Sequence, residues 1–295
     1  MELIEGVFEL AEQFMEKPKY LKINEEETKK VAEQMLNTGI KKFPYESDGT
    51  DAFEICWKEL IASSINYCFF YGRSDVRPKG SSSSVMYEIV NEAFDMSVHK
   101  LDEEFEPLFF FRKGAYSWKE MQYGLAYNRL PLLEERLHHL KEVQENGAIY
   151  IKHLVASKGE DFYQFFHDLV LLFPGFASDQ FLKRASLFFL QLNRHLGWFE
   201  DAVKVLPVPA DYQVPNMMRH FGCIDYSQQL YQKIWRGDLI PKHSRMECEI
   251  RAATIITARM IQELTGWSVA DVDGWFWLRR KETTLPFHLT ITTDY

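Results

Sequence analysis

Asp211 is the residue of this sequence whose surroundings best suit a catalytic group. It stands in PVPADYQVPNMMRHFG, residues 207 to 222, between a proline-rich turn and a short apolar helical run. A carboxylate among apolar and aromatic neighbours is either well hydrogen-bonded or has its pKa raised for catalysis. Aspartate is also a preferred N-cap, and the helix is expected to begin near Pro215. The residues alone favour a cap or turn role.

Lys183 is the second candidate, with Arg184 beside it. Both lie in SDQFLKRASLFFLQLNRHLG, residues 178 to 197, which is apolar on nearly every face and predicts a buried helix. Near the start of that helix, about a turn and a half in, the lysine and the free backbone N–H groups would favour an anionic ligand. Alternatively, both side chains extend along the helix into solvent, and the sequence alone favours this interpretation.

Other ionisable residues are weaker candidates. His138 and His139 are adjacent and point to different parts of a helix surface, which disfavours a shared metal site. Glu247 and Arg251 are four residues apart, a spacing that predicts a surface ion pair. The sequence has no G-x-G-x-x-G, Walker, H-E-x-x-H or G-x-S-x-G motif, so nucleotide-cofactor enzymes, metalloproteases and serine hydrolases lack their signatures.

The elements that would position these residues are predicted to be almost all helical, because apolar residues recur at spacings of three and four. Asn24 predicts an N-cap, and Ser117 and Ser244 each precede a glutamate by three residues, the capping-box spacing. The helix after Ser244 is expected to run about 20 residues to Gly266. Residues 131 to 147 predict another helix, which starts at its proline and stops at its final Asn-Gly pair.

Strand signals are few. The clearest is HLTITTDY, residues 288 to 295, and a weaker one is EPLFFFRK, residues 106 to 113. RPKGSSSSV, residues 77 to 85, predicts a surface loop. We therefore expect a mainly α fold with at most a small β-sheet. The 295 residues, 46% of them apolar, suit one large domain over 1–295, or two packed helical lobes around one cleft.

Composition excludes some partners and compartments. A net charge of −9 argues against a nucleic-acid polymer as ligand but allows a small anionic substrate. No C-x-x-C spacing, signal peptide or long apolar run is visible, so we expect a cytoplasmic protein that does not enter a membrane. Reduced, mostly buried thiols are expected for the four cysteines, Cys56, Cys68, Cys223 and Cys248.

Several segments occur together in one order along the chain: SINYCFF, LPLLEER, FPGF, FLKRASLFF, ADYQVPNMMRHFGCIDYS, ECEIRAATI and LPFHLTITTDY. From about residue 50 to the C-terminus, this set resembles the queuosine salvage protein family, which hydrolyses queuosine 5′-phosphate to release the base queuine. The resemblance implies a mainly helical fold similar to DNA glycosylases, with a cleft for one nucleotide.

The resemblance also implies roles for individual residues. Asp211 matches the family's catalytic carboxylate, and Lys183 matches an active-site lysine that contacts phosphate or ribose. Both assignments reverse the structural interpretations that the residues alone favour. The substrate-binding residues expected are Asn66, Phe70, Tyr212, His220 and Trp277, whose aromatic members would form walls for a flat 7-deazaguanine ring. The family implies no metal and no cofactor.

The sequence departs from its family at Phe70, where the family usually has a tryptophan, and at the serines of 81 to 84, where aromatic residues are common. Two other functions stay open. One is a helix-hairpin-helix glycosylase acting on nucleic acid, which shares a lysine and an aspartate as its active pair. The other is a protein that binds a deazapurine without cutting it. The acidic balance counts against the first, and a retained Asp211 counts against the second.

Overall fold

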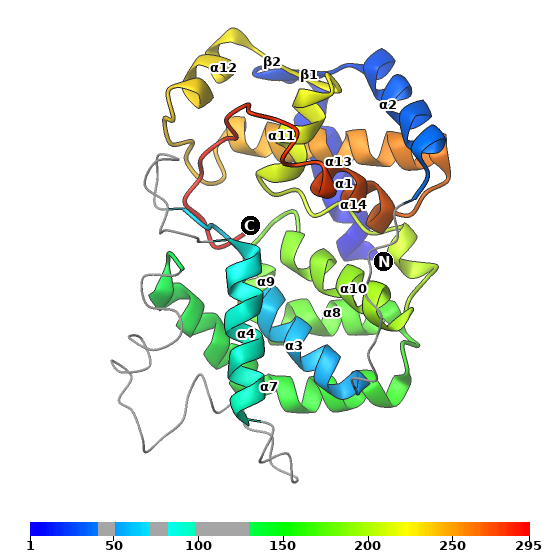
Figure 1. Ribbon diagram of the computed structural model, residues 1–295, viewed down its shortest axis with the longest axis vertical. Helices are drawn as coiled ribbons and strands as arrows, with labels where there is room; N and C mark the ends of the chain where they lie inside the picture. Colours follow the sequence, from blue (N-terminus) through cyan, green and yellow to red (C-terminus); the bar gives the residue numbers. More distant parts are fainter. Residues whose placement is uncertain (41–50, 71–81, 98–129) are drawn as a thin grey trace.

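The structure is a computed structural model, and it describes residues 1–40, 51–70, 82–97 and 130–295 (Figure 1). These residues form twelve α-helices, one 3-10 helix and two short strands, which confirms the mainly α fold class. The likeness to DNA glycosylases stays a prediction. The elements are α1 (Glu2–Glu16), β1 (Leu21–Ile23), α2 (Glu25–Thr38), α3 (Ala52–Ser64), α4 (Ser83–Ser97), α7 (Leu133–Ser157), α8 (Phe162–Leu172), α9 (Pro174–Ala177), α10 (Lys183–Leu196), η2 (Ala202–Lys204), α11 (Gln213–His220), β2 (Ile224–Tyr226), α12 (Gln228–Trp235), α13 (Arg245–Thr265) and α14 (Val269–Leu278).

The helices lie in two groups. Figure 1 shows α1, α2, α11, α12, α13 and α14 in the upper group, and α3, α4, α7, α8, α9 and α10 in the lower one. The C-terminal segment runs down from the upper group and ends between the two (Figure 1). The carbonyl of Tyr295 accepts a hydrogen bond from the backbone N–H of Cys68, which follows α3, at 2.8 Å. The last residues thereby connect the two groups.

Helix α13 is the centre of the upper group, where it packs against α1, α2, α11 and α14. Its start follows the predicted cap, because the Ser244 side chain accepts a hydrogen bond from the backbone N–H of Glu247 at 3.4 Å. It ends at Gly266, whose φ of +70° gives the left-handed stop that glycine adopts without strain. At α2 the predicted cap is also confirmed, since Asn24 accepts from the N–H of Glu27 at 3.2 Å.

The two strands differ from the predicted ones. β1 and β2 pair antiparallel, with Leu21 opposite Tyr226 and Ile23 opposite Ile224, and fasten the N-terminal helices to the segment after α11. The prediction of a strand over 288 to 295 is wrong. Within the described chain, this segment pairs only through one isolated parallel bridge from Leu289 to Leu239. Its side chains instead make contacts, among them those of Asp294 with Lys242 and His243. The candidate at 106 to 113 lies outside the described residues.

Two helices depart from the predicted boundaries. α7 does not stop at residue 147 but continues to Ser157. Gly147 is there for packing, because a Cβ on it would lie 2.7 Å from the Trp57 ring of α3. Of the loop predicted over 77 to 85, residues 77 to 81 lie outside the described residues. Residues 83 to 85 are not loop but the first turn of α4, since Ser82 accepts from the N–H of Val85 at 3.3 Å. The capping box predicted at Ser117 lies outside the described residues.

The cysteines are free and buried, as predicted. In the described ranges, no helix combines the length and the apolarity that crossing a membrane requires.

Candidate active site

Helix α10 begins at Lys183, five residues later than residue 178, where the sequence places its start. Leu182 precedes it with a φ of +50°, a left-handed conformation unfavourable for leucine. Asp179 holds this turn, because its carboxylate accepts from the N–H of Phe181 at 3.0 Å and from the N–H of Lys183 at 2.7 Å. Lys183 is therefore the first residue of a helix whose entry a buried carboxylate fixes.

The Lys183 side chain is buried, so the prediction that it extends into solvent is wrong. Its Nζ donates to the backbone carbonyl of Asn66 at 2.9 Å and to the side-chain Oδ1 of Asn66 at 3.2 Å. Burial lowers the pKa of Lys183 to about 8, and the negative charge of Asp211 opposes that shift most. Arg184 is buried as well, and donates to the carbonyls of Ser64 and Gly175.

Asp211 precedes α11 and caps it, as one of the two interpretations predicts. Its Oδ1 accepts from the backbone N–H groups of Gln213 at 2.6 Å and Val214 at 3.1 Å. Within the described chain, no group donates a hydrogen bond to the other oxygen, Oδ2. The residue as a whole is half-buried. Burial raises its pKa, while the charge of Lys183 and the two N–H groups pull it down. Capping thus occupies one oxygen, and Oδ2 accepts from no group within the described chain.

Asp273, from α14, is a third charged residue of this site that sequence reasoning missed. It is buried, and its Oδ2 accepts from the guanidinium of Arg194 on α10 at 3.0 Å. Burial raises its pKa, and its charge in turn raises the pKa values of both Lys183 and Asp211. A lone carboxylate inside the apolar run VDGWFWL was the signal that could have found it.

Three aromatic rings meet beside Asp211. The ring of Tyr212 lies 4.6 Å from that of Phe287 and 5.4 Å from that of Phe70, between ring centroids. Phe70 also contacts Phe287 at 5.7 Å. Phe70 and Tyr212 are buried, at 1% and 7% exposed, and Phe287 is half-buried. Phe287 was not predicted.

The remaining predicted residues lie at different distances from this centre. Trp277 is half-buried on α14, and the guanidinium of Arg280 rests 3.6 Å from the centre of its ring. Burial lowers the pKa of Arg280, and the nearby charges of Tyr212 and Asp211 raise it, so this unpredicted arginine faces the site. His220 is exposed at the last residue of α11, at the end opposite Asp211, and is not brought to the other residues.

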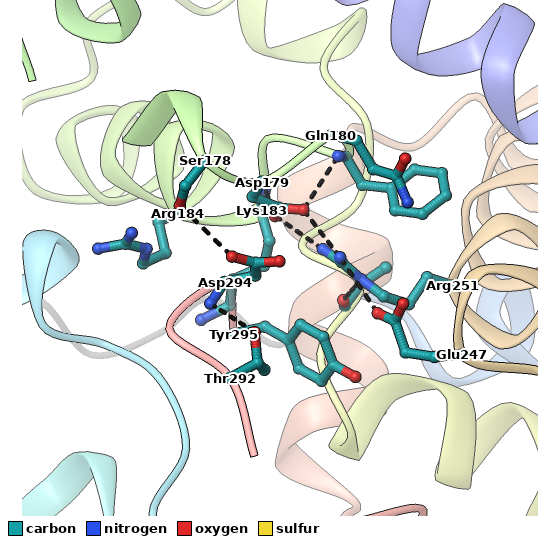
Figure 2. Close-up of polar contacts among 12 residues, drawn as sticks. Ser178, Asp179, Gln180, Lys183, Arg184, Glu247, Arg251, Thr292, Asp294 and Tyr295 are labelled. Atoms are coloured by element: carbon teal, nitrogen blue, oxygen red, sulfur yellow. Dashed lines mark hydrogen bonds and ion pairs between the residues drawn. The ribbon is translucent and has the colours of Figure 1, made fainter. Parts of the chain in front are cut away.

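Behind Lys183 lies a buried ion pair between Asp179 and Arg251 (Figure 2). Arg251 also lies 3.4 Å from Glu247, one turn earlier on α13. Both residues are fully buried, so the prediction of a surface pair is wrong. Although burial pushes the pKa of Asp179 up, Arg251 and the two backbone N–H groups hold it below its usual value.

The arrangement places the carboxylate of Asp211, whose Oδ2 has no described donor, near the buried ammonium of Lys183 and the second carboxylate, Asp273. Such a set can stabilise positive charge that develops on a small substrate, and can take up a proton. In the part of the chain that the structure describes, no three His, Cys, Asp or Glu side chains are grouped to hold a metal ion.

Over residues 49–292 the sequence matches the family described as queuosine salvage protein. Lys183 and Asp211 lie inside this match, and α1 and α2 precede it.

Three curated relatives carry the name queuosine 5′-phosphate N-glycosylase/hydrolase. The protein of Sphaerobacter thermophilus is 29% identical over 191 residues, which cover 56% of this chain and 59% of that protein. The protein of Mus musculus is 25% identical over 240 residues, 73% of this chain and 69% of that protein. The protein of Dictyostelium discoideum is 32% identical over 128 residues, 39% of this chain and 40% of that protein. The matched stretch is therefore less than two thirds of the Sphaerobacter and Dictyostelium proteins.

Proposed function

Because the chain belongs to the queuosine salvage protein family, we propose that it hydrolyses the N-glycosidic bond of queuosine 5′-phosphate. The products are queuine, which becomes available for tRNA modification, and ribose 5-phosphate. The observation that carries the proposal is that Asp211, whose Oδ2 accepts from no described residue, lies close enough to the buried Lys183 for each charge to shift the pKa of the other. We further propose that residues 1–295 form one domain whose two groups of helices share this site.

In the proposed reaction, the bond between C1′ of the ribose and the ring nitrogen of the base breaks, and its electron pair leaves with the base. Positive charge then develops on the ribose, so a fixed carboxylate beneath C1′ stabilises the transition state. Water supplies the oxygen that C1′ gains, and one proton reaches the base nitrogen. Oδ2 of Asp211 serves this chemistry either by attacking C1′ or by taking a proton from the water.

The two cations of the site, Lys183 and Arg280, are proposed to contact different parts of the substrate. Nζ of Lys183 is held by Asn66 close to Asp211, which suits contact with the ribose or the adjoining phosphate oxygen. Arg280 lies on the ring of Trp277 and is half-buried, so part of it is accessible to an anionic group of a bound ligand. We assign recognition of the 5′-phosphate chiefly to Arg280, because a guanidinium binds two phosphate oxygens at once.

The base would occupy the aromatic side of the site. Phe287 is half-buried and packs on the buried ring of Tyr212, next to Asp211, and offset stacking on such a ring stabilises a flat heterocycle. Phe70 packs against both rings. The ligand is one nucleotide rather than a nucleic-acid polymer, which agrees with the net charge of −9.

The test is to incubate the protein separately with queuosine 5′-phosphate, queuosine and GMP, and to follow free base by chromatography. We expect base release from queuosine 5′-phosphate, slower release from queuosine and none from GMP. Binding of queuosine 5′-phosphate with no base released would favour the deazapurine-binding alternative. Release of a base from a DNA or RNA oligonucleotide, and not from the free nucleotide, would favour the helix-hairpin-helix glycosylase.

A further inference from the structure

Arg251 contacts the chain segments of both proposed catalytic residues. Its guanidinium donates to both oxygens of Asp179, at 2.8 and 2.7 Å, in the turn that leads into Lys183. Its Nε donates to the backbone carbonyl of Ala210, the residue before Asp211, at 2.9 Å. Arg251 itself is fully buried on α13 and belongs to neither segment.

Each contact fixes a backbone group next to a catalytic side chain. Asp179, held by Arg251, accepts from the N–H of Lys183 and so sets where α10 begins. The peptide unit that joins Ala210 to Asp211 is held on both sides, because its carbonyl accepts from Arg251 and its N–H donates to the carbonyl of Pro209 at 2.8 Å. The direction in which Asp211 leaves the backbone depends on that peptide plane.

Two aromatic rings hold the guanidinium in place. Its carbon lies 4.8 Å from the ring centre of Phe181 and 4.4 Å from that of Tyr295. Figure 2 shows Tyr295, Asp179 and Glu247 arranged around Arg251. A planar guanidinium enclosed by two rings, a bidentate carboxylate and a carbonyl has little freedom to move.

We propose that Arg251 is a positioning residue for the reaction proposed above: it sets Lys183 and Asp211 relative to each other by holding both backbones with one guanidinium. The inference rests on the proposed function. Displacing a catalytic group by about 1 Å lowers the rate by about 100-fold, so a residue that holds two such groups affects turnover more than affinity. The buried Arg184 offers a contrast, since its guanidinium contacts carbonyls of the lower group of helices only.

The variant that tests this is Arg251→Lys, which keeps a cation beside Asp179 but cannot donate to both of its oxygens and to Ala210 at once. We expect kcat to fall by about 10- to 100-fold with KM within about threefold of wild type. Activity should fall at high pH as Lys183, whose pKa is about 8, loses its proton. In Arg251→Lys this fall should move to higher pH, because a loosened turn exposes the lysine to solvent and weakens the burial that lowers its pKa.

Glu249→Gln is the matched control. Glu249 is also fully buried on α13, but accepts from the N–H groups of Lys19 and Tyr20 and from Arg245, away from the site. This variant should melt at a lower temperature with unchanged kcat and an unchanged pH profile. Circular dichroism and melting curves give the folded fraction by which each rate is divided. An Arg251→Lys enzyme that is folded and has a kcat within twofold of wild type overturns the proposal.

If Arg251→Lys does not fold, Phe181→Leu decides the question, because it loosens the guanidinium without unpairing a buried charge. We expect kcat to fall by about 3- to 10-fold, and a value within twofold of wild type overturns the proposal. The wild type is assayed in parallel. If it releases no base, the proposed function fails and this inference with it; if the wild type is active and neither variant is impaired, only the inference on Arg251 fails.

Discussion

Lys183 and Asp211 each exert the largest charge effect on the other's pKa, although 28 positions separate them in the chain. Lys183 is the first residue of α10, and Asp211 caps α11. The two helices belong to different groups in Figure 1, so the two charges come close only where the groups meet. Each charge offsets part of the other's burial cost, and a change at one therefore alters the ionisation of its partner.

Asp211→Asn should abolish base release and leave the fold intact. The amide retains an oxygen that caps α11 but has no charge to stabilise the ribose, so we expect kcat to fall by about 1,000-fold or more. The melting temperature should change little. Chromatographic assay of base release and thermal melting measure the two effects. Asp51→Asn is the control, since Asp51 caps α3 in the same manner and should leave turnover unchanged. Near-native turnover of Asp211→Asn would remove the catalytic assignment.

The pH profile of kcat/KM should have two limbs. Asp211 must be ionised, so activity rises through its raised pKa; Lys183 must be protonated, so activity falls above about 8. The charge of Asp273 raises both pKa values, and Asp273→Asn should therefore move both limbs to lower pH. Asp271→Asn, two positions earlier in the capping box of α14, should move neither. Limbs that stay in place in Asp273→Asn would show that these two groups do not govern the profile.

Arg280→Ala should impair hydrolysis of the nucleotide far more than hydrolysis of the nucleoside. If Arg280 contacts the 5′-phosphate, kcat/KM for queuosine 5′-phosphate should fall by about 30- to 900-fold, which corresponds to about 2 to 4 kcal/mol of lost transition-state stabilisation, and the value for queuosine should hardly change. Lys183→Ala should impair both substrates, because its Nζ lies close to Asp211. Arg279→Ala is the control: its guanidinium rests on Trp275 instead, 3.9 Å from the ring centre. Equal losses on both substrates in Arg280→Ala would contradict the phosphate assignment.

Phe70→Trp should sharpen selection of the base. A tryptophan pushes the rings of Tyr212 and Phe287 closer to the ligand, and a ring pair contributes about 0.5 to 1.5 kcal/mol, so the kcat/KM ratio of queuosine 5′-phosphate to a simpler 7-deazaguanine nucleotide should rise by about 2- to 10-fold. Because Phe70 is buried, we also expect a stability loss of about 1 to 3 kcal/mol. Phe166→Trp, in the core of the lower group, should lose stability without altering the ratio. An unaltered ratio in Phe70→Trp would exclude Phe70 from the base pocket.

The sequence by itself determined the elements whose signals come from neighbouring residues. Asn24 caps α2, Ser244 caps α13 and Gly266 ends it, as predicted, because a cap needs one side chain or one backbone conformation in place. The ordered motifs also predicted the family that the match over 49–292 supports. The neighbours of Asp211 predicted both a capping and a catalytic role, and the structure shows that its Oδ1 caps α11, whereas the catalytic role stays a prediction.

Only the tertiary structure decided which charges are buried and where the elements with distant partners begin or end. Gly147 continues α7 because the ring of Trp57, from another helix, fills the space beside it. α10 begins at Lys183 because Asp179 caps that turn, and Asp179 is held by Arg251 from 72 positions away. A spacing of four places two charges side by side on a helix, but their exposure depends on what packs over them. The residues that cover a charge come from distant parts of the chain, and the local sequence does not indicate which of them will pack against it.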